Sequence, residues 1–240
     1  MTLSARRIRA IVRKELREYR RKASIVVSMA IIPTIFLVQP LVVAFALPAS
    51  SSRQLAHEHL LLYLLGIPAL VPVLTASYAV VGEREQGTLE PVLTTPVRRE
   101  ELLLGKAIAS LVPSVVVAYV VYAAFVACLT LFAQPEVASS LLQWPQILAQ
   151  VVFTPLIAAW SIWLGIGISA KTNDIRVSQQ LGVLASLPTV VVTSLIAFDV
   201  IHPTLALAVG LGAALLLLVG LGWLIVSAAF DRERLITGTR

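Results

Sequence analysis

The chain has 240 residues, of which 58% are hydrophobic and only 13% are charged, whereas soluble domains carry about 25% charged residues. So few charges cannot cover a globular surface of this size, which argues against a soluble enzyme. The formal net charge of +6 would suit nucleic acid as a partner, but the positions of the basic residues fit a membrane instead.

Residues 4–22 predict a basic amphipathic helix ahead of the first long apolar segment. Apolar side chains recur at three- and four-residue spacing, at Ile8, Ile11, Val12, Leu16 and Tyr19. The remaining surface is basic, relieved only by Glu15 and Glu18, and includes Arg6, Arg7, Arg13, Arg17, Arg20 and Arg21. Such a helix lies in the headgroup plane, with its apolar face toward the hydrocarbon and its arginines toward anionic lipid. The same helix could also contact a cytoplasmic partner.

Six long apolar runs follow, and they predict membrane spans. They are residues 24–47, 60–82, 107–133, 146–170, 177–198 and 205–230. Even the shortest gives a helix of roughly 33 Å, enough to cross a hydrocarbon core of about 30 Å. We therefore expect an all-α polytopic membrane protein in which residues 1–240 form a single transmembrane domain.

The basic residues predict the orientation of this domain. Of the 19 Lys and Arg residues, only Arg53 lies in a loop on the outer side; the others lie in the N-terminal segment, in 83–106, in 171–176 or after 230. Cytoplasmic loops carry the excess of Lys and Arg. We therefore expect both termini in the cytoplasm, in a multi-pass protein of the plasma (inner) membrane, and no nucleic-acid partner.

No Asp, Glu, Lys or Arg lies in the interior of the predicted spans, although proton-coupled transporters and voltage sensors need such groups at depth. The deepest polar residues are neutral: Gln39, Thr75, Ser77, Thr154, Gln179 and Gln180. They either satisfy the backbone and each other or bind a substrate. In the last span Ala206, Gly210 and Ala214 form a stripe of small residues suited to close helix contact, within the chain or between subunits.

The loop at 83–106 combines charges with a short apolar stripe. Thr88 can cap a short helix, and Glu90 lies in its first turn, near the positive end of the dipole. Leu89, Val92 and Leu93 then fall on one face. A helix of about six residues is unstable alone in water, so the stripe must dock on the membrane surface or in a groove of another protein.

The residues of this loop also match a known pattern. Glu83, Glu85, Gly87, Thr88, Leu89, Glu90, Leu93, Thr94, Pro96, Gly105 and Lys106 resemble the E-x-G-T-L-E-x-L-x-x-x-P…G-K run of type-2 ATP-binding-cassette (ABC-2) permeases. The resemblance covers the whole chain. That family is similar in its N-terminal amphipathic helix, its six spans, its cytoplasmic termini and the place of this loop after the second span.

The resemblance implies that the loop forms a coupling helix seated in a cleft of a separate ATPase subunit. The coupling residues would be Glu83, Glu85, Gly87, Thr88, Leu89, Glu90, Val92, Leu93 and Pro96. It also implies two permease chains, taken here as a homodimer, and two ATPase chains that bind the ATP and Mg²⁺. The chain itself has no G-x-x-x-x-G-K-[ST] phosphate loop and is expected to need no cofactor.

One feature departs from the family pattern. Many members carry a re-entrant pair of half-helices between the fifth and sixth spans, but here only Asp199–Thr204 separates these spans. Either Pro188 breaks the fifth span, so that 189–204 supplies a reduced version, or the feature is missing.

The function expected from these observations is the permease of an exporter. Without charge at depth and with short outer loops, a hydrophobic, amphiphilic or lipid-like cargo, such as a drug or antibiotic, fits best. Two alternatives stay open: a non-transporting membrane anchor or regulator of an ATPase, and a membrane-embedded lipid enzyme. No catalytic or metal site is expected, because His57 and His59 do not share a helix face.

Overall fold

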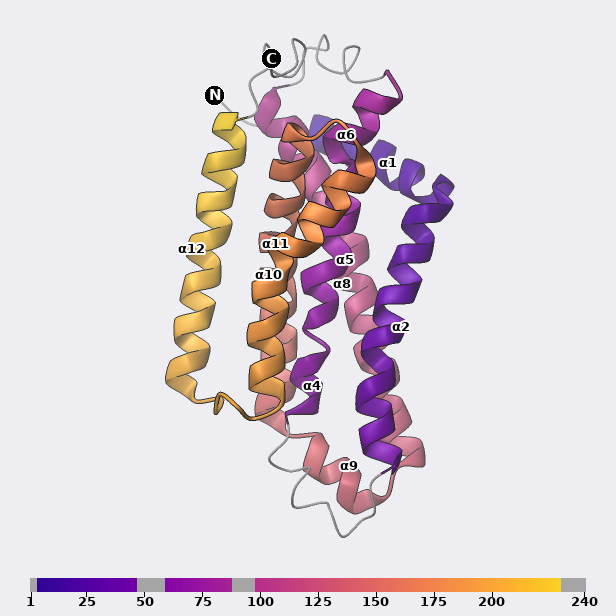
Figure 1. The fold of residues 1–240 in the computed structure, drawn as a ribbon, viewed down its shortest axis with the longest axis vertical. Coiled ribbons are helices and arrows are strands. Elements are labelled where there is room, and N and C mark those ends of the chain that lie inside the picture. Colours follow the sequence, from indigo (N-terminus) through magenta and orange to yellow (C-terminus); the bar gives the residue numbers. More distant parts are fainter. Residues whose placement is uncertain (1–3, 47–58, 88–97, 230–240) are drawn as a thin grey trace.

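The computed structural model describes residues 4–46, 59–87 and 98–229, and every regular element within these ranges is a helix. Six helical segments are long and apolar enough to cross a membrane: Ile25–Ala46, Leu60–Glu85, Arg99–Phe132, Trp144–Lys171, Ile175–Ala197 and Leu205–Ala228. Each of the six predicted runs overlaps one of them. The predicted all-α fold with six spans is therefore confirmed (Figure 1).

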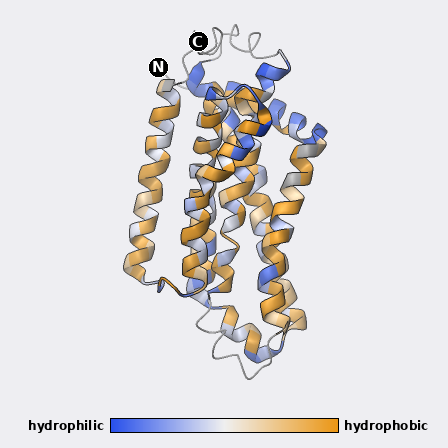
Figure 2. Cartoon of the chain, in the orientation of Figure 1, coloured by the Kyte–Doolittle hydropathy of each residue, from blue (hydrophilic) through white to orange (hydrophobic). Residues whose placement is uncertain are grey.

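The N-terminal helix α1 (Ala5–Arg21) precedes the first span, α2 (Ala23–Ala46). Lys22 between them is extended, with φ −94° and ψ 101°, so the chain changes direction there. Figure 1 shows α1 crossing one end of the bundle, and Figure 2 shows hydrophilic residues gathered at that same end. The N-terminal helix expected from the sequence is thus present and lies at the polar end.

The second span is broken into α4 (Leu60–Tyr63), α5 (Gly66–Ala76) and α6 (Tyr78–Glu85). Pro68 falls in the first turn of α5, where its missing N–H costs little. At the break between α5 and α6, Ser169 of α10 (Trp144–Lys171) donates to the Ser77 carbonyl at 2.7 Å. The same hydroxyl accepts the Val80 and Val81 N–H groups, at 3.1 and 3.0 Å. A neighbouring helix therefore satisfies the freed backbone groups, as a span in lipid requires.

The third span, α8 (Arg99–Phe132), begins well before the predicted run at 107. Its first turn carries Glu100 and Glu101, which suit the positive end of the helix dipole. The Arg98 N–H donates to Glu101 Oε2 at 3.3 Å and caps the start of the helix. The apolar run therefore underestimates the length of this helix, because two turns with charged residues extend the helix beyond the hydrocarbon.

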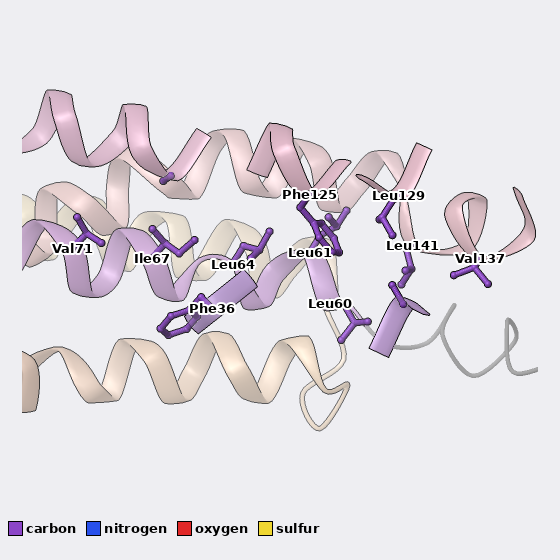
Figure 3. Packing of buried hydrophobic residues seen from close by; sticks show 12 residues of the cluster. Phe36, Leu60, Leu61, Leu64, Ile67, Val71, Phe125, Leu129, Val137 and Leu141 are labelled. Carbon is purple, nitrogen blue, oxygen red and sulfur yellow. The ribbon is translucent and has the colours of Figure 1, made fainter. Parts of the chain in front are cut away.

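A short helix that the sequence reading did not expect, α9 (Pro135–Leu141), follows α8 at the opposite end of the bundle from α1 (Figure 1). Pro135 occupies its first position, where proline is favoured. Val137 and Leu141 are buried in a cluster with Leu60 and Phe125 (Figure 3). This helix closes the end of the core between the second and third spans.

The last two spans are α11 (Ile175–Ala197) and α12 (Leu205–Ala229). α11 continues through Pro188 without interruption, so the fifth span is not broken, and residues 175–229 contain no re-entrant half-helices. α12 packs along α10 and has almost no contact with α11. Figure 1 shows α12 at one edge of the bundle.

The centre of the bundle is α5, which packs against α2, α8, α10 and α11. Its closest neighbour is α10, and Gly165 permits this approach: a Cβ there would lie 2.9 Å from the Val73 carbonyl oxygen. These four spans surround α5, whereas α12 lies outside them against α10.

Candidate functional site

The charged residues of the described chain concentrate where α1 crosses the start of α8 and the end of α6. Four contacts in succession hold α1 on α8. At the first, Glu101 is buried and accepts the Ser4 N–H at 2.8 Å and an Arg7 guanidinium N–H at 3.0 Å. Arg7 Nε lies 3.0 Å from the other oxygen of the same carboxylate. The charge of Glu101 is therefore paired with that of Arg7, and a hydrogen bond between charged groups is stronger than one between neutral groups.

The second contact joins Ile11 to Gly105. A Cβ at Gly105 would lie only 2.6 Å from Ile11 Cγ2, so the two helices can cross at this distance only because residue 105 has no side chain. Gly105 belongs to the G-K pair at the end of the loop pattern, and the close packing of α1 explains why this position is a glycine.

The third contact is a buried ion cluster. Lys106 of α8 is 0% exposed, and Glu15 of α1 and Glu83 of α6 are 3% and 4% exposed. Lys106 Nζ lies 3.0 Å from Glu15 Oε1 and 2.9 Å from Glu83 Oε1. Lys14 Nζ lies 2.7 Å from the same Glu83 oxygen. Two cations thus meet the two buried carboxylates, with Glu18 Oε1 at the rim 3.3 Å from Lys14 Nζ, so each buried charge is paired, as buried charges must be.

The fourth contact places the Tyr19 hydroxyl 3.0 Å from Ser110 Oγ, both buried. Burial raises the pKa of Tyr19, so its hydroxyl stays protonated. Burial alone would lower the pKa of Lys14, but the hydrogen bond to Glu83 and the charges of Glu83, Glu15 and Glu18 outweigh it and raise that pKa. Lys14 is therefore fully charged at neutral pH.

The ion cluster forms the base of the loop 88–97. Glu83 precedes this loop in the last turn of α6, and Lys106 follows it in α8, so their contact ties the two ends of the loop together. Because Glu15 binds the same Lys106, α1 is fixed to that base as well. Lys106 therefore joins α1, α6 and α8 at the base of the loop.

The end of α6 is also tied to the connection between α10 and α11. Arg84 donates to the Thr172 carbonyl at 2.7 Å and to Asn173 Oδ1 at 2.6 Å. Glu85 accepts the Ile175 N–H at 3.0 Å, at the start of α11. α6 ends at Glu85, and Gly87, two residues later, has a φ of +66°, a left-handed conformation that glycine adopts without strain.

Three of the nine predicted coupling residues can be placed. Glu83 is buried in the ion cluster, Glu85 is exposed on α6, and Gly87 follows the end of that helix. The other six, Thr88, Leu89, Glu90, Val92, Leu93 and Pro96, lie outside the described residues. Glu83 thus faces the interior of the chain, where it pairs with Lys106 at the loop base.

The face of α1 that the sequence analysis assigns to lipid lies on α8 instead. Ile11 packs on a cluster with Leu103 and Ala107, and Val12 packs on one with Tyr19 and Ala109. Of the six arginines assigned to lipid, Arg7 turns toward Glu101, while Arg6, Arg13, Arg17, Arg20 and Arg21 are exposed. The bundle therefore receives the apolar face, and the basic face stays available to headgroups.

Sequence reasoning missed Glu15, Glu101 and Lys106 as members of the site. Glu15 could have been found, because it lies four residues after Ile11 and four before Tyr19, on the face that the apolar spacing marks as buried. The α1 partners of Glu101 and Lys106 lie 97 and 91 positions away in the chain, and no local pattern reveals such pairs.

The neutral polar residues of the spans have mixed surroundings. Thr75 and Ser77 donate to carbonyls of their own helix, at 2.8 Å each, and Thr154 is within 3.4 Å of Gln150 Nε2. Gln180 is exposed, Gln179 is half-buried, and the carbonyl oxygen of Gln39 is buried. Thr154 belongs to a buried polar row along α10 whose other members, Gln146, Gln150, Ser161 and Ser169, sequence reasoning did not single out.

The small residues Ala206, Gly210 and Ala214 are exposed, and a Cβ at Gly210 would meet nothing within 4 Å. This stripe does not serve packing within the described chain. In the loop between α11 and α12, Asp199 Oδ1 lies 2.7 Å from His202 Nδ1. The same oxygen lies 3.7 Å from His59 Nε2, just before α4. Over residues 4–46, 59–87 and 98–229 no three His, Cys, Asp or Glu residues group as a metal site; His57 and Glu58 lie outside these ranges.

The family model described as "ABC-2 family transporter protein" matches residues 9–218, which is most of the chain and covers most of α1, the loop base and the spans as far as the middle of α12. No curated protein matches the chain.

Proposed function

The chain belongs to the ABC-2 family of transporter proteins, and from that premise we propose that it is the permease of an exporter driven by a separate ATPase subunit. Family membership makes it a multi-pass membrane subunit of an ABC transporter. The direction of transport, the cargo and the stoichiometry are our proposals. We propose a homodimer of permeases with two ATPase chains, which bind the ATP and Mg²⁺.

The observation that carries this proposal is the ion cluster at the base of the loop. A loop that receives force from a partner must be attached firmly to the spans it moves. Here Glu83 and Lys106 join both ends of the loop, Lys106 also binds Glu15 of α1, and Arg84 and Glu85 bind the start of α11. A push on the loop would therefore move α1, α6, α8 and α11 together.

The partner would bind the loop through the apolar stripe of Leu89, Val92 and Leu93. Helix-in-groove docking suits such a stripe, because the helix is too short to be stable without a partner. Glu83 belongs to the same motif, but it would not contact the partner. It would act as a positioning residue that holds the base of the loop. In this arrangement α1 and the loop lie on the cytoplasmic side of the plasma membrane, with both termini.

The cargo that fits best is hydrophobic or amphiphilic. In the described spans every charged side chain lies near one end of the bundle, and the interior offers only neutral polar groups such as Gln150 and Ser161. An inorganic ion or a highly charged solute would need charged partners at depth. The short connections at the opposite end favour export over the uptake of cargo from a binding protein.

The test is co-purification of the ATPase with tagged permease variants. Burial of a leucine contributes roughly 1.5–3 kcal/mol, and an aspartate in its place would also leave a charge in an apolar groove. Leu89→Asp and Leu93→Asp should therefore abolish co-purification, while membrane insertion is unchanged because no span is touched. Arg98→Ala, outside the stripe, is the matched control and should have a smaller effect.

If the Asp variants retain the ATPase at the level of the unmodified chain, the stripe does not bind it and the coupling assignment is wrong. Reconstitution of the complex into vesicles then tests transport itself. Efflux that depends on ATP supports the exporter, whereas ATPase binding without any movement of amphiphiles would support an anchoring or regulatory subunit.

A further inference from the structure

A cavity of about 360 Å³ lies between α11 and α12, with α10 and α4 behind it. Its back wall includes Leu62, Ile157 and Trp160, and its sides are formed by residues such as Val192 of α11 and Leu211 of α12. No charged residue lines it. Two of its threonine hydroxyls are engaged by nearby backbone: Thr193 donates to the Val190 carbonyl, and Thr204 accepts the Leu207 N–H. The lining is therefore apolar in practice.

The cavity opens sideways, into the region that the spans assign to the hydrocarbon. α11 and α12 are consecutive spans, yet they hardly touch each other. Pro188, Val192 and Ala214 line the cavity and are exposed between these helices. An opening between two membrane-spanning helices admits lipid rather than water.

The separation of the two helices is built into the loop that joins them. Asp199 has a φ of 55°, a left-handed conformation that ends α11. The Val200 N–H donates to the Leu195 carbonyl at 2.9 Å, which completes this helix end. The His59 N–H donates to the Ala197 carbonyl at 2.9 Å, so the loop is also attached to the second span. α12 then begins only at Leu205, displaced toward α10.

The shape of the cavity indicates what can occupy it. Its wall on α12 runs from Leu207 to Leu218, about 16 Å along the helix, so the cavity is elongated along the direction of the spans. An elongated apolar space that opens toward the hydrocarbon suits one extended hydrocarbon chain.

We propose that this cavity binds the hydrocarbon chain of a membrane lipid, whose polar head lies at the loop 199–204. That loop borders one end of the cavity, and His202 there is exposed and paired with Asp199 at 2.7 Å. The polar rim stands at one end only, and the rest of the lining is apolar, which matches an amphiphile with one tail in the site. The site does not depend on the proposed transport function, because it needs neither the ATPase nor the loop 88–97.

Trp160 in the back wall supplies the assay. The full chain is placed in nanodiscs of dimyristoyl phosphatidylcholine and titrated with lysophosphatidylcholine that carries a dibrominated stearoyl chain, which quenches tryptophan on contact. A bound chain gives quenching that saturates at a low mole fraction of probe. The saturating part should disappear in Trp160→Phe, because the other tryptophans do not line the cavity.

Two alanines of α12 give a matched pair of variants. Ala208 lines the cavity, whereas Ala213 is exposed on the same helix and does not line it. Ala208→Phe should raise the mole fraction of probe at half-saturation by about tenfold or more, because a phenyl ring at this position takes up the space of the bound chain. Ala213→Phe should bind the probe as the unmodified chain does.

Quenching of the unmodified chain that rises in proportion to the probe, without saturation, would overturn the proposal, whatever the variants do. So would equal half-saturation in Ala208→Phe and Ala213→Phe. If Ala208→Phe instead converts a dimer to a monomer in light scattering and no saturating quenching is seen, the opening is a contact between two copies of the chain and not a lipid site.

Discussion

Replacement of Lys106 by methionine tests the ion cluster directly. Methionine keeps the length of the side chain and removes its charge, so Glu15 and Glu83 lose the cation that lies 3.0 and 2.9 Å from their oxygens. Lys14 would remain as their common partner, at 3.5 and 2.7 Å. The site would then bury one unbalanced negative charge.

The magnitude follows from these distances. At an effective dielectric constant of about 20, each contact near 3 Å contributes about 5–6 kcal/mol of attraction, and the loss of water around the ions offsets most of it. Removal of one partner leaves the other desolvated, and such variants typically lose about 3–5 kcal/mol. Lys106→Met should therefore lower the free energy of unfolding by about 3–5 kcal/mol.

A double-mutant cycle separates the ion pair from mere damage to packing. Glu15→Gln alone should also destabilise the chain, but Lys106→Met with Glu15→Gln restores a neutral site of Lys14 and Glu83. The double variant should cost less than the sum of the two singles by about 1–3 kcal/mol. Unfolding of the purified chain in mixed micelles, titrated with a denaturing detergent, measures all three.

Arg99→Met is the control on the same helix. The Arg99–Glu100 pair is 3.9 Å apart with side chains 47% and 43% exposed, so its loss should change stability by less than about 1 kcal/mol. The reasoning is refuted if Lys106→Met costs no more than Arg99→Met, or if the costs of Lys106→Met and Glu15→Gln simply add.

Two further predictions concern the attachment of α1. Gly105→Ala should lower the unfolding midpoint, although alanine favours helix, because a Cβ there would lie 2.6 Å from Ile11 Cγ2; Gly212→Ala, whose Cβ would meet nothing within 4 Å, should leave it equal or higher. A higher midpoint for both would show that α1 is not packed tightly on α8. Because the pKa of Lys14 is raised in the folded chain, Lys14 contributes fully to the free energy of unfolding below its ordinary pKa, about 10.4. This contribution is lost only as the pH rises through the higher pKa of the folded state. The stability difference between Lys14→Met and the unmodified chain should thus be equal at about pH 6 and pH 9; a difference that falls between these values would contradict the assignment of Lys14 as a fully charged member of the cluster.

The spans were predictable because apolar runs report burial in lipid directly. Their ends were less predictable, since a helix continues wherever its backbone is capped: α8 extends back to Arg99 through charged turns that no hydropathy pattern includes. The short helix α9 carried usable signals, with Pro135 at its first position and Glu136 in its first turn. Its burial against Leu60 and Phe125 depends on tertiary contacts, which no local pattern shows.

The loop base was only half visible in the sequence. The pattern from Glu83 to Lys106 identified the family, but a pattern does not say which way a side chain faces. Glu83 is predicted as a coupling residue, and it lies in the interior, paired with Lys106. The separation of α12 from α11 was not visible at all, because it depends on the left-handed turn at Asp199 and on the packing of α12 against α10.

The burial of the cluster explains why charges rather than leucines stand at the loop base. Apolar residues of similar volume would often be as stable or more so, so stability alone does not account for Glu15, Glu83 and Lys106. An apolar contact tolerates sliding of one helix along another, whereas a buried lysine must meet its carboxylates or strand them. The cluster therefore permits one register of α1, α6 and α8 and penalises every other. A permease that passes movement from a loop to its spans needs that property, since a base that slips would absorb the movement before the spans received it.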